Sequence, residues 1–161
     1  MTMTMQALHE SAAPFPARRS RASRVRRRAG DPFPHVLSQL PLFRACTARE
    51  LKIVARHSIV LRVPAGRVMV REGDASREFL AILAGHAGVT QVGLPSRLLG
   101  PNEWHGEVDL FARSESAVTV TTLTDLDVLV VERREFQGLI DAIPGFRHQI
   151  IASLARQIRS K

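Results

Sequence analysis

The sequence has little of what catalytic and metal sites are usually built from. Its single cysteine, Cys46, excludes an internal disulfide and any metal site made of several cysteines. Six histidines occur, but none form a His-x-His or His-x-x-x-His pair, which a metal enzyme built on a β-barrel would need. There is no Gly-x-Ser-x-Gly sequence and no phosphate loop ending in Gly-Lys-Ser/Thr. Cys46 precedes a predicted helix without an identifiable His or Asp partner, so we expect a domain that is not an enzyme and holds no metal.

No apolar run approaches the roughly 18 residues of a membrane span, so we expect no membrane span and a cytoplasmic protein. The scarcity of cysteine fits a reducing compartment. The 161 residues are enough for one domain.

The positive charge is concentrated at the start of the chain. Residues 1–30 hold seven arginines and one acid and so account for +6 of the net charge of +8. Residues 1–34 show no core pattern and carry several prolines, which predicts a disordered tail. Alternatives are a basic arm that contacts phosphates, a transit peptide, a nuclear-localisation-like patch, or a start of translation further in. Nucleic-acid binding is therefore expected only through this tail.

The body, 35–161, begins with helical patterns and then changes period. We expect a short helix over 35–42 that ends at Pro41, and a helix over 48–57 that starts with a capping box of Thr47 and Glu50. Alternating apolar residues separated by Gly/Pro turns, one of them at 93–95, then predict many short strands and a closed β-barrel or roll. Two helices follow, at 133–140 and from Pro144 onward. The fold class is thus mainly β with flanking helices.

One segment, 100–120, suits a polar ligand. A turn, one tryptophan, Gly106-Glu107, a few apolar residues and a β-rich run predict a strand–turn–short helix–strand unit. A short helix presents free backbone N–H groups to an anion, and the glycine allows close approach of the backbone. A carboxylate beside it can accept hydrogen bonds from sugar hydroxyls. Taken without its flanks, Gly-Glu is equally a β-turn with a surface acid.

With the flanks included, the chain resembles the cyclic nucleotide-binding domain of the catabolite activator protein/FNR group. The resemblance covers roughly 35–160. It rests on six ordered segments: Val63-Pro-Ala-Gly66, Arg71-Glu-Gly-Asp74, Phe79-Leu-Ala-Ile-Leu-Ala-Gly85, Leu99-Gly-Pro-Asn-Glu-Trp-His-Gly-Glu107, Leu123-Thr-Asp125 and Arg134-Glu-Phe136. It implies an eight-stranded β-roll, or jelly roll, with N-terminal helices and two C-terminal helices. It also implies cAMP or cGMP as the candidate ligand, with no cofactor otherwise.

The family's phosphate-binding cassette matches only in its first half. Gly106 and Glu107 are present, and in the family this glutamate binds the ribose 2′-hydroxyl. Asp109 stands where a small residue is usual. The arginine that pairs with the cyclic phosphate falls at Ser116. A hydrogen bond to a charged group contributes about 1.5–3 kcal/mol, and losing one partner of a buried charged pair costs about 2–5 kcal/mol. Phosphate binding is therefore expected to be roughly ten- to several-thousand-fold weaker.

The residue after the missing arginine is also changed, because Ala117 stands at a Ser/Thr position. Arg113, three residues before Ser116, is the candidate substitute for the lost positive charge. The ligand-binding residues predicted from the resemblance are Gly106, Glu107, Val108, Asp109, Arg113, Ser116 and Ala117.

The resemblance favours a regulatory or sensor module with weakened or altered cyclic nucleotide binding. The alternative is a degenerate roll that serves as a protein-interaction domain without nucleotide. The chain stops at Lys161, where the family's dimerisation helix extends, so no attached output domain is expected. An unidentified protein partner and a homodimer through the C-terminal helix are the remaining partner hypotheses.

Overall fold

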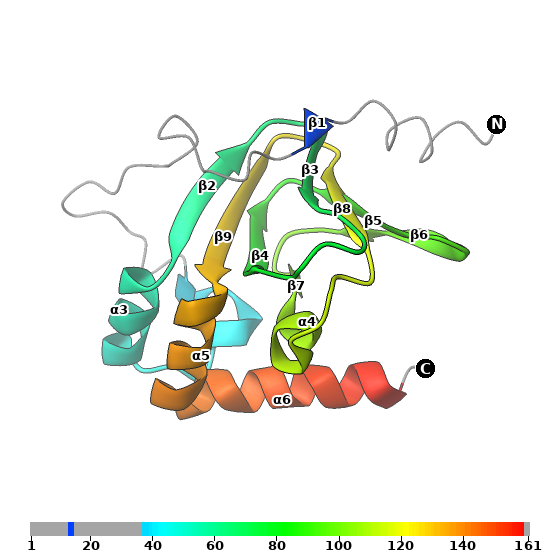
Figure 1. Cartoon of the computed structure of the whole chain (residues 1–161). Coiled ribbons are helices and arrows are strands. Elements are labelled where there is room, and N and C mark those ends of the chain that lie inside the picture. Colours follow the sequence, from blue (N-terminus) through cyan, green and yellow to red (C-terminus); the bar gives the residue numbers. More distant parts are fainter. Residues whose placement is uncertain (1–12, 15–36, 160–161) are drawn as a thin grey trace.

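The computed structural model describes residues 13–14 and 37–159, and it shows a two-sheet roll with helices gathered at one end (Figure 1). The strands are β1 Ala13–Pro14, β2 Ile59–Val63, β3 Arg67–Val70, β4 Glu78–Ala84, β5 Ala87–Gln91, β6 Leu94–Leu99, β7 Trp104–His105, β8 Thr119–Thr122 and β9 Leu126–Glu132. The helices are the 3₁₀ turn η2 Pro41–Phe43, α3 Ala48–Arg56, α4 Glu107–Ala112, α5 Arg133–Ala142 and α6 Pro144–Arg159.

The strands form two sheets. One has the order β1-β3-β8-β5-β6 and the other the order β2-β9-β4-β7. All pairings among β2 to β9 are antiparallel, so the eight-stranded roll with flanking helices is confirmed. The two-residue β1 pairs in parallel with β3. The rest of the predicted tail, 1–12 and 15–34, lies outside the described residues, so its disorder stays a prediction.

The central strands β4 and β9 are apolar on both faces, because each face covers a different core. In β9, Leu129 and Val131 pack on the helix side, whereas Val128 and Val130 pack inside the roll. Alternate side chains of a strand point to opposite faces, so a strand between two cores reads as a continuous apolar run. This strand therefore joins the helical end of the molecule to the interior of the roll.

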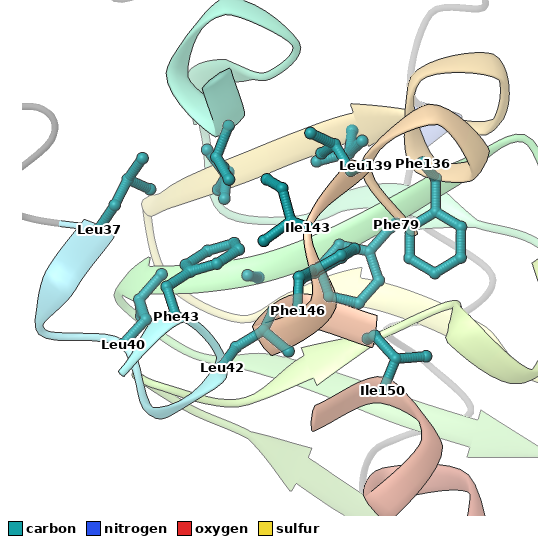
Figure 2. Packing of buried hydrophobic residues seen from close by; sticks show 14 of the residues in the cluster. Leu37, Leu40, Leu42, Phe43, Phe79, Phe136, Leu139, Ile143, Phe146 and Ile150 are labelled. Atoms are coloured by element: carbon teal, nitrogen blue, oxygen red, sulfur yellow. The ribbon is translucent and has the colours of Figure 1, made fainter. Parts of the chain in front are cut away.

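The core at the helical end is built around four phenylalanines (Figure 2). Phe146 of α6 lies at its centre, with its ring centroid 5.6 Å from that of Phe43, 5.7 Å from that of Phe136 and 6.2 Å from that of Phe79. Stacked and edge-to-face arrangements at these separations are favourable beyond the burial of apolar area. These contacts hold α6 against β4, and so they fix the helix that covers the candidate site.

Most local expectations hold. The capping box is confirmed, since Thr47 N–H donates to Glu50 Oε1 at 2.9 Å and Glu50 N–H to Thr47 Oγ1 at 3.1 Å. The turn expected at 93–95 is wrong: it lies at residues 92–93, and Pro95 belongs to the edge strand β6. The helix expected to end at Pro41 is also revised. A helical turn at 37–38 is followed by η2, which Pro41 begins, and residues 35–36 lie outside the described part.

Candidate functional site: the Gly106–Ser116 segment under helix α6

The predicted strand–turn–short helix–strand unit is present as β7, α4 and β8. Gly106 joins β7 to α4 with φ 111°, a left-handed conformation that favours glycine. A Cβ at this position would lie 2.6 Å from the carbonyl oxygen of Glu78 and 3.3 Å from the Cα of Phe79, both on β4. Glycine is therefore required here by the packing of the cassette on the sheet, whether or not a ligand binds.

The side chain of Glu107 points toward α6 and is almost completely buried, at 2% exposure. Its Oε1 accepts hydrogen bonds from Ser153 Oγ at 3.0 Å and from Gln157 Nε2 at 2.5 Å. Ser153 Oγ in turn accepts a hydrogen bond from the indole Nε1 of Trp104 at 3.3 Å. The carboxylate of the cassette is thus satisfied by the chain's own C-terminal helix.

Burial dominates the acid–base chemistry of Glu107. Desolvation raises its pKa, and this outweighs the hydrogen bonds from its own backbone, Ser153 and Gln157, which act in the opposite direction. The charge of Asp109, two residues along, raises the pKa further. The donors on α6 therefore hold the Glu107 carboxyl in place, but burial still makes its charged form unfavourable.

Ser116 holds two loops together. Its backbone N–H donates to Asp74 O, and its carbonyl accepts from Gly73 N–H, both at 2.8 Å. Its hydroxyl donates to Val118 O at 2.8 Å and accepts from Val118 N–H at 3.3 Å. The side chain is only 3% exposed, so this position anchors the loop between β3 and β4 to the end of the cassette.

Asp109 is also buried, at 8% exposure, and its carboxyl meets the hydroxyls of Ser76 and Ser116. Desolvation raises the pKa of Asp109, and the two hydroxyls partly counter the rise. Neither contact is a full hydrogen bond: Ser76 Oγ has no partner at hydrogen-bonding geometry, and Ser116 has one hydroxyl proton, which already points at Val118 O. The carboxyl therefore has polar neighbours but weak direct bonds.

His105 completes this group. It pairs with Leu80 across β4 and β7, so its ring lies on the interior side of the roll, where Leu80 packs. Its Nε2 is 4.0 Å from Asp109 Oδ2 and has no hydrogen-bond partner. Desolvation, followed by the positive charge of Arg97, lowers its pKa to about 4. The imidazole is therefore neutral at physiological pH, and its contact with Asp109 is not an ion pair there.

The seven predicted residues do not converge on one point. Asp109 and Ser116 come together, Glu107 turns toward α6, and Gly106 packs on β4. Val108, Arg113 and Ala117 are exposed. Arg113 ends α4 in a left-handed conformation and makes no ion pair with a described residue, so nothing places it as a substitute cation.

Four residues that join the group were not singled out from the sequence: Ser76, His105, Ser153 and Gln157. Ser153 and Gln157 lie four residues apart on one face of α6, a spacing that could have indicated a polar pair facing the cassette. Within the described residues, no three His, Cys, Asp or Glu side chains gather as a metal site requires. No helix in that part of the chain is both long and apolar enough to cross a membrane.

The roll and the Gly106–Ser116 segment that packs on α6 define a class of domain that the family comparison identifies. The model of the cyclic nucleotide-binding domain matches residues 60–142 of the 161, and the chain belongs to this family. The match contains β3 to β9 and the whole Gly106–Ser116 segment.

Relatives from bacteria and fungi share the domain. The cyclic AMP receptor protein of Thermus thermophilus is 27% identical over 124 residues, covering 74% of this chain and 57% of that protein. A cAMP-dependent protein kinase regulatory subunit of Pyricularia oryzae is 27% identical over 113 residues, covering 69% of this chain and 29% of that protein. The chain therefore spans about half of the length of the first relative and less than a third of the second.

Solved structures agree with the fold. The catabolite activator protein of Thermus thermophilus has a TM-score of 0.67 at 26% identity and covers 74% of this chain and 59% of that one. The regulatory domain of the Toxoplasma gondii cAMP-dependent kinase, solved with cAMP, has a TM-score of 0.67 at 19% identity, covering 80% and 49%. The second likeness, at this identity, concerns the fold alone.

Proposed function

We propose that this chain is a regulatory or sensor module whose cyclic nucleotide binding is weakened or altered relative to its family. The relatives are a receptor protein and a kinase regulatory subunit, which supports a regulatory and not a catalytic role. One observation carries the proposal: a buried serine, Ser116, stands where the resemblance places the phosphate-binding arginine. The candidate ligands are cAMP and cGMP.

The contacts of Glu107 support the altered part of the proposal. A ribose hydroxyl would need an acceptor on this carboxylate, but Ser153 and Gln157 already donate to Oε1. Because the side chain is only 2% exposed, a ligand hydroxyl would have to reach the second oxygen, Oε2, or displace the contacts with α6. Each hydrogen bond to a charged group contributes about 1.5–3 kcal/mol, so this competition lowers affinity further.

The test measures the affinity of the full chain for cAMP and cGMP by calorimetry and by thermal shift. A ligand that binds only the folded state raises stability by RT ln(1 + [L]/Kd), about 2.7 kcal/mol at a concentration of 100 Kd. We expect a clear shift only at millimolar nucleotide. The Ser116→Arg variant should bind at least about tenfold more tightly, because it supplies the missing positive charge.

The Ser114→Arg variant is the matched control, since Ser114 is exposed in the same loop and the added charge is equal. Micromolar binding by the wild-type chain would refute the weakening. An equal gain in both arginine variants would show that net charge, and not the position of Ser116, limits affinity.

The second candidate is a protein-interaction domain that binds no nucleotide. The internal hydrogen bonds of Glu107 favour it, because they occupy Oε1 of this carboxylate without a ligand. Failure of cAMP and cGMP to bind either the wild-type chain or the Ser116→Arg variant would select this candidate. We also propose a homodimer through α6, which sedimentation of the full chain tests. Nucleic-acid binding through residues 1–30 is a further proposal, and it is tested by measuring salt-dependent DNA binding with and without these residues.

A further inference from the structure

Asp109 lies where the cassette should accommodate the anionic part of a ligand. The resemblance places the phosphate-binding arginine at position 116, so the side chain at that position is expected to face the phosphate. In this chain Ser116 instead faces the carboxyl of Asp109. An acid supplied by α4 thus stands beside the position that should meet a ligand's negative charge.

No positive charge balances this acid. Among the described residues, no Lys or Arg forms an ion pair with Asp109 or Glu107. Arg97, exposed on β6, is close enough for its charge to act on His105 but reaches neither carboxyl. A phosphate monoanion placed here would meet like charge in a buried setting, where unscreened repulsion is strong.

The same group contains polar atoms that lack partners. Ser76, which is nine-tenths buried, has an unpaired Oγ that faces the Asp109 carboxyl, and His105 Nε2 is also unpaired. Buried polar atoms without a hydrogen bond are uncommon, because each loses its bonds to water without gaining a partner. A carboxylate and a neutral imidazole nitrogen accept hydrogen bonds, and a serine hydroxyl both donates and accepts, so these groups suit a ligand with hydroxyl groups.

We propose that Asp109 sets the specificity of this site, so that it excludes a phosphate monoanion and takes an uncharged, hydroxyl-bearing ligand of the nucleoside class. The inference rests on the proposed function, since it concerns the same cassette, and it goes further by naming the residue that selects and the ligand class selected. Glu107 accepts a sugar hydroxyl when its contacts with α6 open. Asp109, Ser76 and His105 form hydrogen bonds to uncharged hydroxyl groups in place of the phosphate contacts.

The test compares two uncharged nucleosides, adenosine and guanosine, with their cyclic monophosphates, using calorimetry on the full chain. Asp109→Asn removes the charge and keeps the size of the side chain. Glu115→Gln is the matched control, because Glu115 is an exposed acid in the same segment. Folding of each variant is checked by circular dichroism and by cooperative unfolding.

We expect the wild-type chain to bind the nucleosides more tightly than the cyclic nucleotides. In the Asp109→Asn variant the affinity for cyclic nucleotides should rise about tenfold or more, with less than about a threefold change for the nucleosides. The Glu115→Gln variant should change neither by more than about twofold. Absence of nucleoside binding to the wild-type chain at several millimolar overturns the ligand class. An unchanged nucleotide affinity in the Asp109→Asn variant, or an equal gain for both ligand types, overturns the role of the charge.

The two proposals fail separately. Micromolar binding of cyclic nucleotide by the wild-type chain refutes the proposed weakening, whereas failure of the Asp109→Asn variant to gain affinity refutes only the inference on Asp109.

A pH titration does not depend on Asp109→Asn and covers the case in which that variant does not fold. The pKa of Asp109 is raised by desolvation, so as the pH falls its carboxyl takes up a proton before an ordinary aspartate would, while the phosphodiester stays anionic. His105, whose Nε2 lies 4.0 Å from this carboxyl, has a pKa of about 4 and stays neutral until the pH nears that value. The pKa of Glu107 is raised as well, so the titration is repeated in the Glu107→Gln variant, in which Asp109 keeps its carboxyl. Cyclic nucleotide affinity should rise as pH falls, and a flat profile contradicts the inference.

Discussion

Replacing His105 by leucine should remove a loss of stability on acidification. The pKa of the buried ring falls from 6.5 to about 4, first because of desolvation and then because of Arg97. The unfolded chain therefore takes up this proton near pH 6.5, and the folded chain only near pH 4. The stability that depends on the neutral ring is fully present above pH 6.5 and is lost as pH falls toward 4. The full loss corresponds to about 3 kcal/mol, and the loss at pH 5 to about 2 kcal/mol.

Urea unfolding of both chains at pH 7.5 and at pH 5 measures this effect. Glu107 and Asp109, whose pKa values are raised, contribute in the opposite direction, but they are common to both chains. The His105→Leu variant should therefore gain about 2 kcal/mol relative to the wild-type chain between the two pH values. The same substitution at the exposed His148 is the control for lost net charge. If the difference in unfolding free energy between the His105→Leu variant and the wild-type chain is the same at both pH values, the titration of His105 does not affect stability and the reasoning is refuted.

Three further variants test the cassette and its support. Gly106→Ala should lower the free energy of unfolding in urea by at least about 2 kcal/mol, because a Cβ would clash with the carbonyl of Glu78. The control Gly73→Ala, at a position with positive φ but open space, should lower it by only about 1 kcal/mol. Equal losses of unfolding free energy in the two variants would contradict this interpretation of Gly106. Glu107→Gln should raise the melting temperature at pH 8, because the raised pKa of Glu107 means that the folded state disfavours the charged carboxylate. This gain should vanish as the pH falls below about 4.5, where the glutamate is neutral in both states. An equal gain at every pH would show that the charge is not its source. Thr47→Ala should cost about 1 kcal/mol of unfolding free energy, and no loss would mean that the capping box is not stabilising.

Local patterns were sufficient to predict most of the secondary structure. The capping box at Thr47 depends on residues three apart, and the strands around Phe79 and Val128 follow from alternation or short apolar runs. The turn near Gly93 was misplaced because Pro95 is usually a turn residue. Pro95 fits into β6 because that strand is at the edge of its sheet, where a missing N–H leaves no ladder bond unmade.

The candidate site was only half predictable, since its contacts join distant residues. Gly106 and Glu107 were identified, but the hydrogen bonds of Glu107 reach 46 and 50 residues along the chain to Ser153 and Gln157. The spacing of Ser153 and Gln157 places them on one helix face, but no local pattern says which distant group that face contacts. Likewise, Asp109 was read as a departure from the family pattern, and its meeting with Ser116 depends on how the two loops fold.

The bond from Trp104 to Ser153 has a practical consequence. Trp104 is the chain's single tryptophan, and its indole shares Ser153 Oγ with the carboxylate of Glu107. Indole fluorescence is sensitive to hydrogen bonding and to water, and in this chain all of it comes from the edge of the cassette. The protein thus carries an intrinsic optical reporter, so that the engagement of Glu107 with α6 can be followed without a label.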